Sequence, residues 1–110
     1  MPTFHTLMNQ LASIDAAERD AARSTLLQMD EDVMDLLVAE FYAGMPEKLA
    51  VALLEIMGEI GGYEALNLLV DVYYTPDTRP ALKVAARFAL LRNADNLDPQ
   101  QVAKLRTDEV

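Results

Sequence analysis

Few residues of this chain belong to the types that carry out chemistry. Its 110 residues include one histidine and no cysteine, so a cysteine nucleophile, a zinc-thiolate site and a multi-histidine metal site are all excluded. The single histidine, His5, follows Phe4 in an amphipathic segment and is interpreted as a surface or edge residue. Glu55 and Glu59 stand one helical turn apart, a spacing at which two carboxylates can act as acid and base. Such pairs are also common on solvated helix faces, so we expect no catalytic residues and no enzyme.

Two further patterns resemble known sites but lack their defining parts. Asp30, Asp32 and Asp35 are spaced like ligands of a calcium loop, yet the glycine and the distant glutamate of that loop are missing. These acids are better explained by the positive end of a helix dipole, which favours negative charge in the first turn. The glycines near the middle of the chain have no lysine at phosphate-loop spacing. The sequence therefore predicts no metal site and no cofactor.

Composition narrows the class of protein. Hydrophobic residues make up 52% of the chain, which favours one folded domain over residues 1–110 rather than disorder. Eighteen acidic residues against nine basic ones give a net charge of −9, which argues against nucleic acid as a partner. Charged residues interrupt every apolar stretch, so we expect no membrane span. The first residues lack a basic leader, and a cytoplasmic location is the expectation.

Helix formers dominate the sequence, and turn residues divide it into segments. Alanine, leucine, methionine, glutamate and glutamine are the residues that lose least entropy in a helix, so we expect an all-α chain. Asp15 with Glu18, and Asp98 with Gln101, have the form of capping boxes at helix starts. Gly44 is expected to end a helix in a left-handed conformation. The predicted helices lie near 4–13, 16–29, 31–43, 46–60, 63–74, 80–93 and 99–106.

The segments repeat with a period of 32 residues. Adding 32 pairs Leu37 with Leu69 and Val38 with Val70, and a third, weaker copy continues toward the end of the chain. This periodicity predicts an α-solenoid of about three antiparallel helix pairs with an extra N-terminal helix. The repeats are expected near 15–44, 46–75 and 79–106. A plain up-down helical bundle remains the alternative, because hairpins of equal length also produce some periodicity.

One stretch carries a family resemblance. Residues 54–66 read LEIMGEIGGYEAL, in which Gly-x-Ile-Gly closes one helix and a second helix with alanine and leucine follows; residues 83–91 look like the start of the next copy. The stretch resembles the short bacterial HEAT repeat of the phycobilisome-lyase type. The resemblance implies a HEAT-like fold. It also implies an alternative function as an accessory subunit of a bilin lyase or isomerase.

A helical wheel of the segment from Val33 separates an apolar face from a polar one. The polar face repeats in the next copy, so in a solenoid the two triplets lie side by side on the inner surface, where such proteins bind partners. The predicted partner-binding residues are Asp35, Ala39, Tyr42, Asn67, Asp71 and Tyr74. Tyrosine suits recognition because its ring buries apolar area while its hydroxyl keeps a hydrogen bond. A solvated face with half-buried tyrosines is the alternative interpretation.

Charges also follow the repeat. Basic residues at i, i+4 and i+8 share one face of the segment from residue 80, and acids occupy equivalent positions one copy earlier. We expect a charge ladder that sets the register between repeats. Its predicted members are Arg23, Glu47, Glu55, Arg79, Lys83 and Arg87. The alternative is that the basic ridge docks an acidic partner or a phosphate.

These observations predict a non-enzymatic protein-protein interaction or scaffold module. The partner is expected to be another protein, held on the inner face of the second helices of the repeats. Self-assembly through the terminal helices is a further alternative. The first predicted helix exposes Phe4, Leu7, Met8 and Leu11 if nothing covers it.

Overall fold

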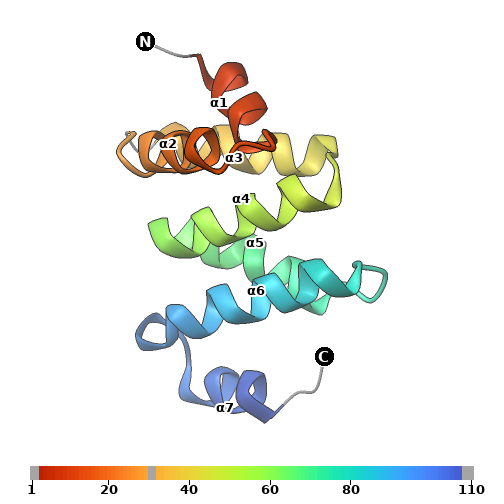
Figure 1. The fold of residues 1–110 in the computed structure, drawn as a ribbon. Helices are drawn as coiled ribbons and strands as arrows, with labels where there is room; N and C mark the ends of the chain where they lie inside the picture. Colours follow the sequence, from red (N-terminus) through yellow and green to blue (C-terminus); the bar gives the residue numbers. More distant parts are fainter. Residues whose placement is uncertain (1–2, 30–31, 108–110) are drawn as a thin grey trace.

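The computed structural model describes residues 3–29 and 32–107, and all regular secondary structure in these ranges is helical. The prediction of an all-α chain is therefore confirmed (Figure 1). The helices are α1 (Phe4–Leu11), α2 (Ala16–Leu27), α3 (Asp32–Ala43), α4 (Glu47–Ile60), α5 (Tyr63–Tyr74), α6 (Pro80–Arg92), the 3-10 helix η1 (Ala94–Asn96) and α7 (Pro99–Thr107). Within the described ranges, each helix is too short or too polar to cross a membrane.

Side-chain caps begin α2 and α7 where the sequence predicted them. The Oδ1 atom of Asp15 accepts a hydrogen bond from the N–H of Ala17 at 2.9 Å, and Asp98 caps α7 in the same way. The expected capping box at Asp15 is only half formed, because its own N–H donates to Ser13 Oγ at 3.0 Å. Gly44 follows α3 with φ at +99°, as predicted. Asp30, the expected start of the third helix, lies outside the described residues.

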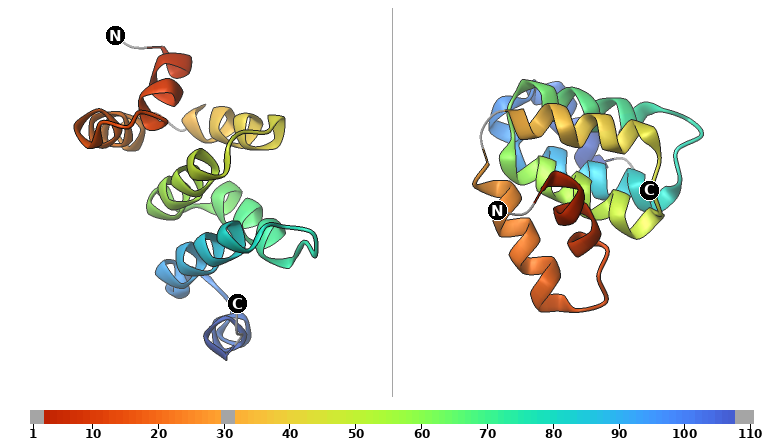
Figure 2. Two further views of the ribbon diagram at one scale, coloured as in Figure 1. Left: turned by 45° about the vertical axis from the view of Figure 1, so that its right-hand side comes forward. Right: turned by 90° about the horizontal axis from the view of Figure 1, so that it is seen from above.

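The helices divide between two sides of an elongated molecule of 43 × 26 × 24 Å. Helix α4 packs against α6, and α3 contacts α5. Figure 2 shows α3 and α5 on one side and α4 and α6 on the other. Helix α5 contacts both α4 and α6, so the buried layer lies between the two sides. Helices α1 and α7 lie at opposite ends of the molecule (Figure 1).

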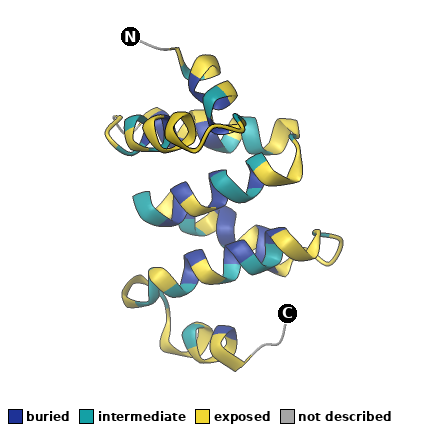
Figure 3. Ribbon diagram, viewed as in Figure 1, coloured by how far each residue is buried: buried dark blue, intermediate teal, exposed yellow. Residues whose placement is uncertain are grey.

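The core runs continuously from α1 to α7 (Figure 3). Helix α1 packs against α2 and buries Leu7, Met8 and Leu11, while Phe4 is half-buried against the same core. The first helix was expected to expose these residues if nothing covered it, and here the rest of the chain covers it. A short helix with one apolar stripe lowers its free energy by folding onto the nearest apolar surface, which here belongs to its own chain.

Helices α4 and α6 approach each other closely at Gly58. A Cβ atom at this position would lie 2.6 Å from the Cβ of Ala89, a distance that real side chains do not reach. Beside this crossing, the Asn93 amide donates to the carbonyl oxygens of Gly58 at 2.8 Å and of Ala89 at 2.9 Å. One side chain therefore bonds to both helices beside this close contact.

This crossing gives a test of the fold. We expect Gly58→Ala to destabilise the protein by about 1–3 kcal/mol, because overpacking outweighs the roughly 1 kcal/mol that alanine gains over glycine in a helix. The double variant Gly58→Ala/Ala89→Gly moves the methyl group to the other helix and should recover most of the loss. Urea unfolding followed by circular dichroism measures both. A single variant as stable as the parent would contradict the close packing.

Candidate functional site

The face predicted to bind a partner is exposed on α3 and α5. Its six residues are all exposed: Asp35, Ala39, Tyr42, Asn67, Asp71 and Tyr74. Tyr42 and Tyr74 leave 59% and 42% of their surface accessible to solvent. On the other side of α3, the predicted apolar residues are buried or half-buried in the core. We call these six residues, together with Glu64, the α3–α5 strip.

A hydrogen bond joins the two helices of the strip. The Tyr42 hydroxyl donates to the Oδ2 atom of Asp71 at 2.9 Å, and its ring meets Phe41 edge-on with centroids 5.7 Å apart. Both Tyr42 and Asp71 line a pocket of about 270 Å³ that the segment before α6, with Arg79, also lines. An exposed tyrosine is thus held in a defined position by partners from its own helix and from the neighbouring one.

A second contact joins the strip near the N-terminal ends of α3 and α5. The carboxyl groups of Asp35 and Glu64 are hydrogen-bonded, which raises the pKa of Glu64 above its ordinary value of 4.5; the negative charge of Asp35 adds to the effect. Glu64 was not predicted as a member of this face. Both contacts, Asp35–Glu64 and Tyr42–Asp71, join residues 29 apart. Each of these α3 residues therefore contacts an α5 residue that lies three positions, about one helical turn, before its equivalent in the 32-residue repeat.

Tyr74, the other tyrosine of the strip, contacts the C-terminal helix α7. The Lys104 ammonium of α7 lies 5.1 Å from the ring centroid of Tyr74, and Tyr73 packs edge-on against the same ring at 5.0 Å. Tyr74 is therefore not in the contact that links Tyr42 to Asp71. The structure brings together two pairs within the strip and places Tyr74 at its α7 edge.

The pKa of Tyr42 is raised above its ordinary value of 10.0. Burial of part of the phenol is the first cause, because it disfavours the phenolate; the hydrogen bond to Asp71 and the negative charge of that carboxylate act in the same direction. The neutral hydroxyl therefore persists as a donor through the physiological range.

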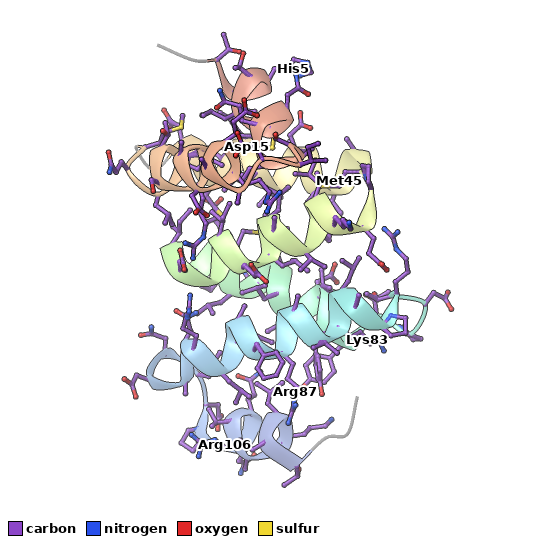
Figure 4. All side chains as sticks on the ribbon, in the orientation of Figure 1. His5, Asp15, Met45, Lys83, Arg87 and Arg106 are labelled. Carbon is purple, nitrogen blue, oxygen red and sulfur yellow. The ribbon has the colours of Figure 1, made fainter. Side chains whose placement is uncertain are left out.

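The charged residues of the predicted ladder make contacts with several elements. Arg23 of α2 forms an ion pair with Glu59, and Arg92 of α6 reaches the same carboxylate at 3.0 Å. Arg87 instead donates through Nε to the carbonyl oxygen of Leu105 at 2.6 Å, on the side facing α7 (Figure 4). Glu59 thus joins α2, α4 and α6, a position that the sequence analysis assigned to a solvated face.

The other ladder members lie apart from this ion-pair cluster. Glu47 is exposed at the start of α4, and Lys83 is half-buried on α6. Arg79 lines the small pocket beside Tyr42, and Glu55 is exposed on α4.

The structure also holds a large hollow that the sequence analysis missed. A groove of about 920 Å³ runs between α4 and α6, with Arg23 of α2 at one end. Phe88, which leaves 62% of its surface accessible, stands on its α6 wall, and Glu55 and Glu59 stand on its α4 wall. We call this hollow the α4–α6 groove. The available signal was a second apolar stripe on the segment from residue 80, spaced by three and four residues.

Neither surface presents a group of side chains that could bind a metal ion. In residues 3–29 and 32–107, no three His, Cys, Asp or Glu side chains are grouped to hold one.

Comparison of the chain with protein-family models, with curated proteins and with solved structures found no match. The two exposed surfaces, the α3–α5 strip and the α4–α6 groove, are therefore the candidate functional sites.

The link between Tyr42 and Asp71 can be measured by titration. Asp71→Asn removes the negative charge, so we expect it to lower the pKa of Tyr42 toward 10.0, with part of the shift kept by burial. The ultraviolet absorbance of tyrosinate, read against Tyr42→Phe to identify the Tyr42 component, reports this value. Since the pKa is raised on folding, stability from the neutral hydroxyl is present below pH 10.0 and lost as pH rises through the raised value. An unchanged titration would refute the contact.

The Asp35–Glu64 pair predicts a pH-dependent stability. Its hydrogen bond is fully present below the ordinary Glu64 pKa of 4.5 and is lost as pH rises through the raised value, leaving two carboxylates that repel. Glu64→Gln keeps a donor for Asp35 at every pH. We expect this variant to melt at a higher temperature than the parent at about pH 7, with the difference vanishing at about pH 4.

The matched control for this pair is Asp20→Asn, which removes one exposed negative charge from α2. It should not reproduce the pH-dependent difference in melting temperature. Equal effects of Glu64→Gln and the control would show that only net charge matters.

Proposed function

We propose that this chain is a non-enzymatic protein-binding module. In this proposal α2 with α3, α4 with α5, and α6 with α7 are the pairs of a HEAT-like α-solenoid, and α1 is an additional N-terminal helix. The 32-residue period supports it, as does the position of α3 and α5 on one side and of α4 and α6 on the other.

The α3–α5 strip is the proposed binding surface for a partner protein. The observation that carries this proposal is the hydrogen bond from Tyr42 to Asp71, which orders an exposed aromatic side chain across two helices. Association costs free energy for every mobile side chain that it immobilises, about 0.5–1.5 kcal/mol each. A tyrosine already held in place has less to lose, and it offers a large contact area.

The charge of the strip indicates the partner's chemistry. Asp35, Glu64 and Asp71 add negative charge to an exposed face of a chain whose net charge is −9. A lysine or arginine placed near Asp35 and Glu64 would relieve the repulsion between these carboxylates at neutral pH. The partner segment is therefore expected to be basic, and its affinity to fall as salt increases.

Two alternative functions are supported by fewer observations. The accessory bilin-lyase function stays a prediction from the sequence resemblance alone. Self-assembly through the first helix was suggested by an exposed apolar face on that helix, but Leu7, Met8 and Leu11 are buried within the chain.

The test is comparative capture of partners. The parent protein and the variant Tyr42→Ala/Asp71→Ala are immobilised in equal amounts, and bound proteins from the native cell are quantified by mass spectrometry. We expect a partner held by the parent to fall by about tenfold or more on the variant, as for loss of a binding hot spot.

Two controls accompany this comparison. Circular dichroism must show that the variant keeps its helices. Phe88→Ala removes an exposed aromatic of α6 that lines the α4–α6 groove, outside the strip, and should leave capture at the strip unchanged. If every captured protein is retained equally by the parent and by the strip variant, the proposed binding surface is wrong.

A further inference from the structure

We propose that the α4–α6 groove binds an amphipathic helix of a partner protein, one that carries lysine or arginine beside its apolar face. This surface is separate from the α3–α5 strip, since it lies on other helices. The inference therefore goes beyond the proposed function and can fail or succeed independently of it.

The α6 wall has the spacing of a helix-packing surface. Ala81, Val84, Phe88 and Leu91 all line the groove, at intervals of three, four and three residues. Apolar residues with this spacing form the stripe along which a second helix packs, because intervals of three and four residues keep them on one side of the helix. The stripe covers eleven residues, and its ten steps span about 15 Å at the rise of an α-helix. A partner helix of about three turns would match it.

Helix α6 uses little of this stripe for its own packing. Its buried core residues are Leu82, Ala85, Ala86, Ala89 and Leu90, and of the stripe the half-buried Leu91 also packs against this core. Phe88 instead leaves 62% of its surface exposed, although burying such a ring is worth about 2 kcal/mol or more. The apolar face of α1 is buried within the chain, whereas Phe88 on this face of α6 stays exposed.

The shape of the groove favours a helix as its occupant. Its volume is about 920 Å³, and two small residues that line it, Ala85 and Ala89, leave only 9% and 6% of their surface accessible. Because these alanines are short and nearly buried, they form the floor of the groove, and a partner's larger side chains would pack over them between the two walls. Val51 adds apolar surface on the α4 side, and Phe88 projects from α6 as an aromatic anchor.

Charge decides which amphipathic helix fits. The α4 wall carries Glu55 and Glu59, and the second of these is already paired with Arg23 and Arg92. Glu55 is exposed and, within the part of the chain that the structure describes, forms no ion pair. A lysine or arginine flanking the partner's apolar stripe would meet this carboxylate along the groove.

A designed peptide tests this inference directly. The probe is a fluorescein-labelled helix with leucine at intervals of three and four residues and lysine beside them, and its scrambled sequence is the comparison. Fluorescence anisotropy with the full chain measures affinity. We expect the ordered peptide to bind and the scrambled one not to. Phe88→Ala should weaken binding about tenfold or more, as loss of an aromatic hot spot does.

Charge exchange gives the second measurement. A peptide with glutamate in place of lysine should bind the parent less tightly, by about three- to fivefold at low salt, since a single exposed ion pair is worth up to about 1 kcal/mol. In Glu55→Lys this preference should invert. The matched control is Tyr63→Ala, which removes another exposed aromatic away from the groove and should not change affinity. Tyr42→Ala should also leave it unchanged.

Three results would overturn the proposal. Equal binding of the scrambled peptide would show that no helix is recognised. Equal effects of Phe88→Ala and Tyr63→Ala would show that the groove is not the site. Light scattering that finds the parent dimeric and Phe88→Ala monomeric would assign the groove to a second copy of this chain instead of a partner.

Discussion

The arrangement of this protein depends on the close approach of α4 and α6 at Gly58 and Ala89. Because glycine has no side chain, the two backbones come near enough for one amide, that of Asn93, to bond to a carbonyl oxygen from each helix. At the same end, Arg92 of α6 reaches Glu59 of α4. Helix α5 then packs against both helices, so a methyl group at position 58 would affect the shared layer on which both exposed surfaces rest.

Local features of the fold could be predicted because they are encoded in adjacent residues. The carboxylates of Asp15 and Asp98 cap helices within two residues of their own positions, and Gly44 ends a helix through its own backbone angle. Features that join distant segments could not be predicted in the same way. The burial of α1 depends on how it folds onto α2, which periodicity does not specify. The offset of 29 between contacting residues of α3 and α5 likewise follows from how the helices slide against each other.

The two candidate surfaces differ in how far the sequence could predict them. Exposure of the α3–α5 strip followed from a helix with one apolar side. The α4–α6 groove was missed because α6 carries two apolar stripes, and periodicity alone does not say which of them faces the core. The crossing with α4 decides between them. Alanine at position 89 permits the close approach to Gly58 of α4, and this packing leaves Phe88 exposed and Val84 half-buried.

The two proposed binding surfaces also differ in the kind of interaction that they offer a partner. Carboxylates and hydroxyl hydrogen bonds at the surface dominate the strip, so its interactions weaken with salt and change as Glu64 and Tyr42 titrate. Apolar side chains dominate the groove, and apolar burial is insensitive to charge screening. A partner that dissociates in salt would therefore point to α3 and α5. One that remains bound when salt is raised, and is released when the Phe88 ring is removed, would point to α4 and α6.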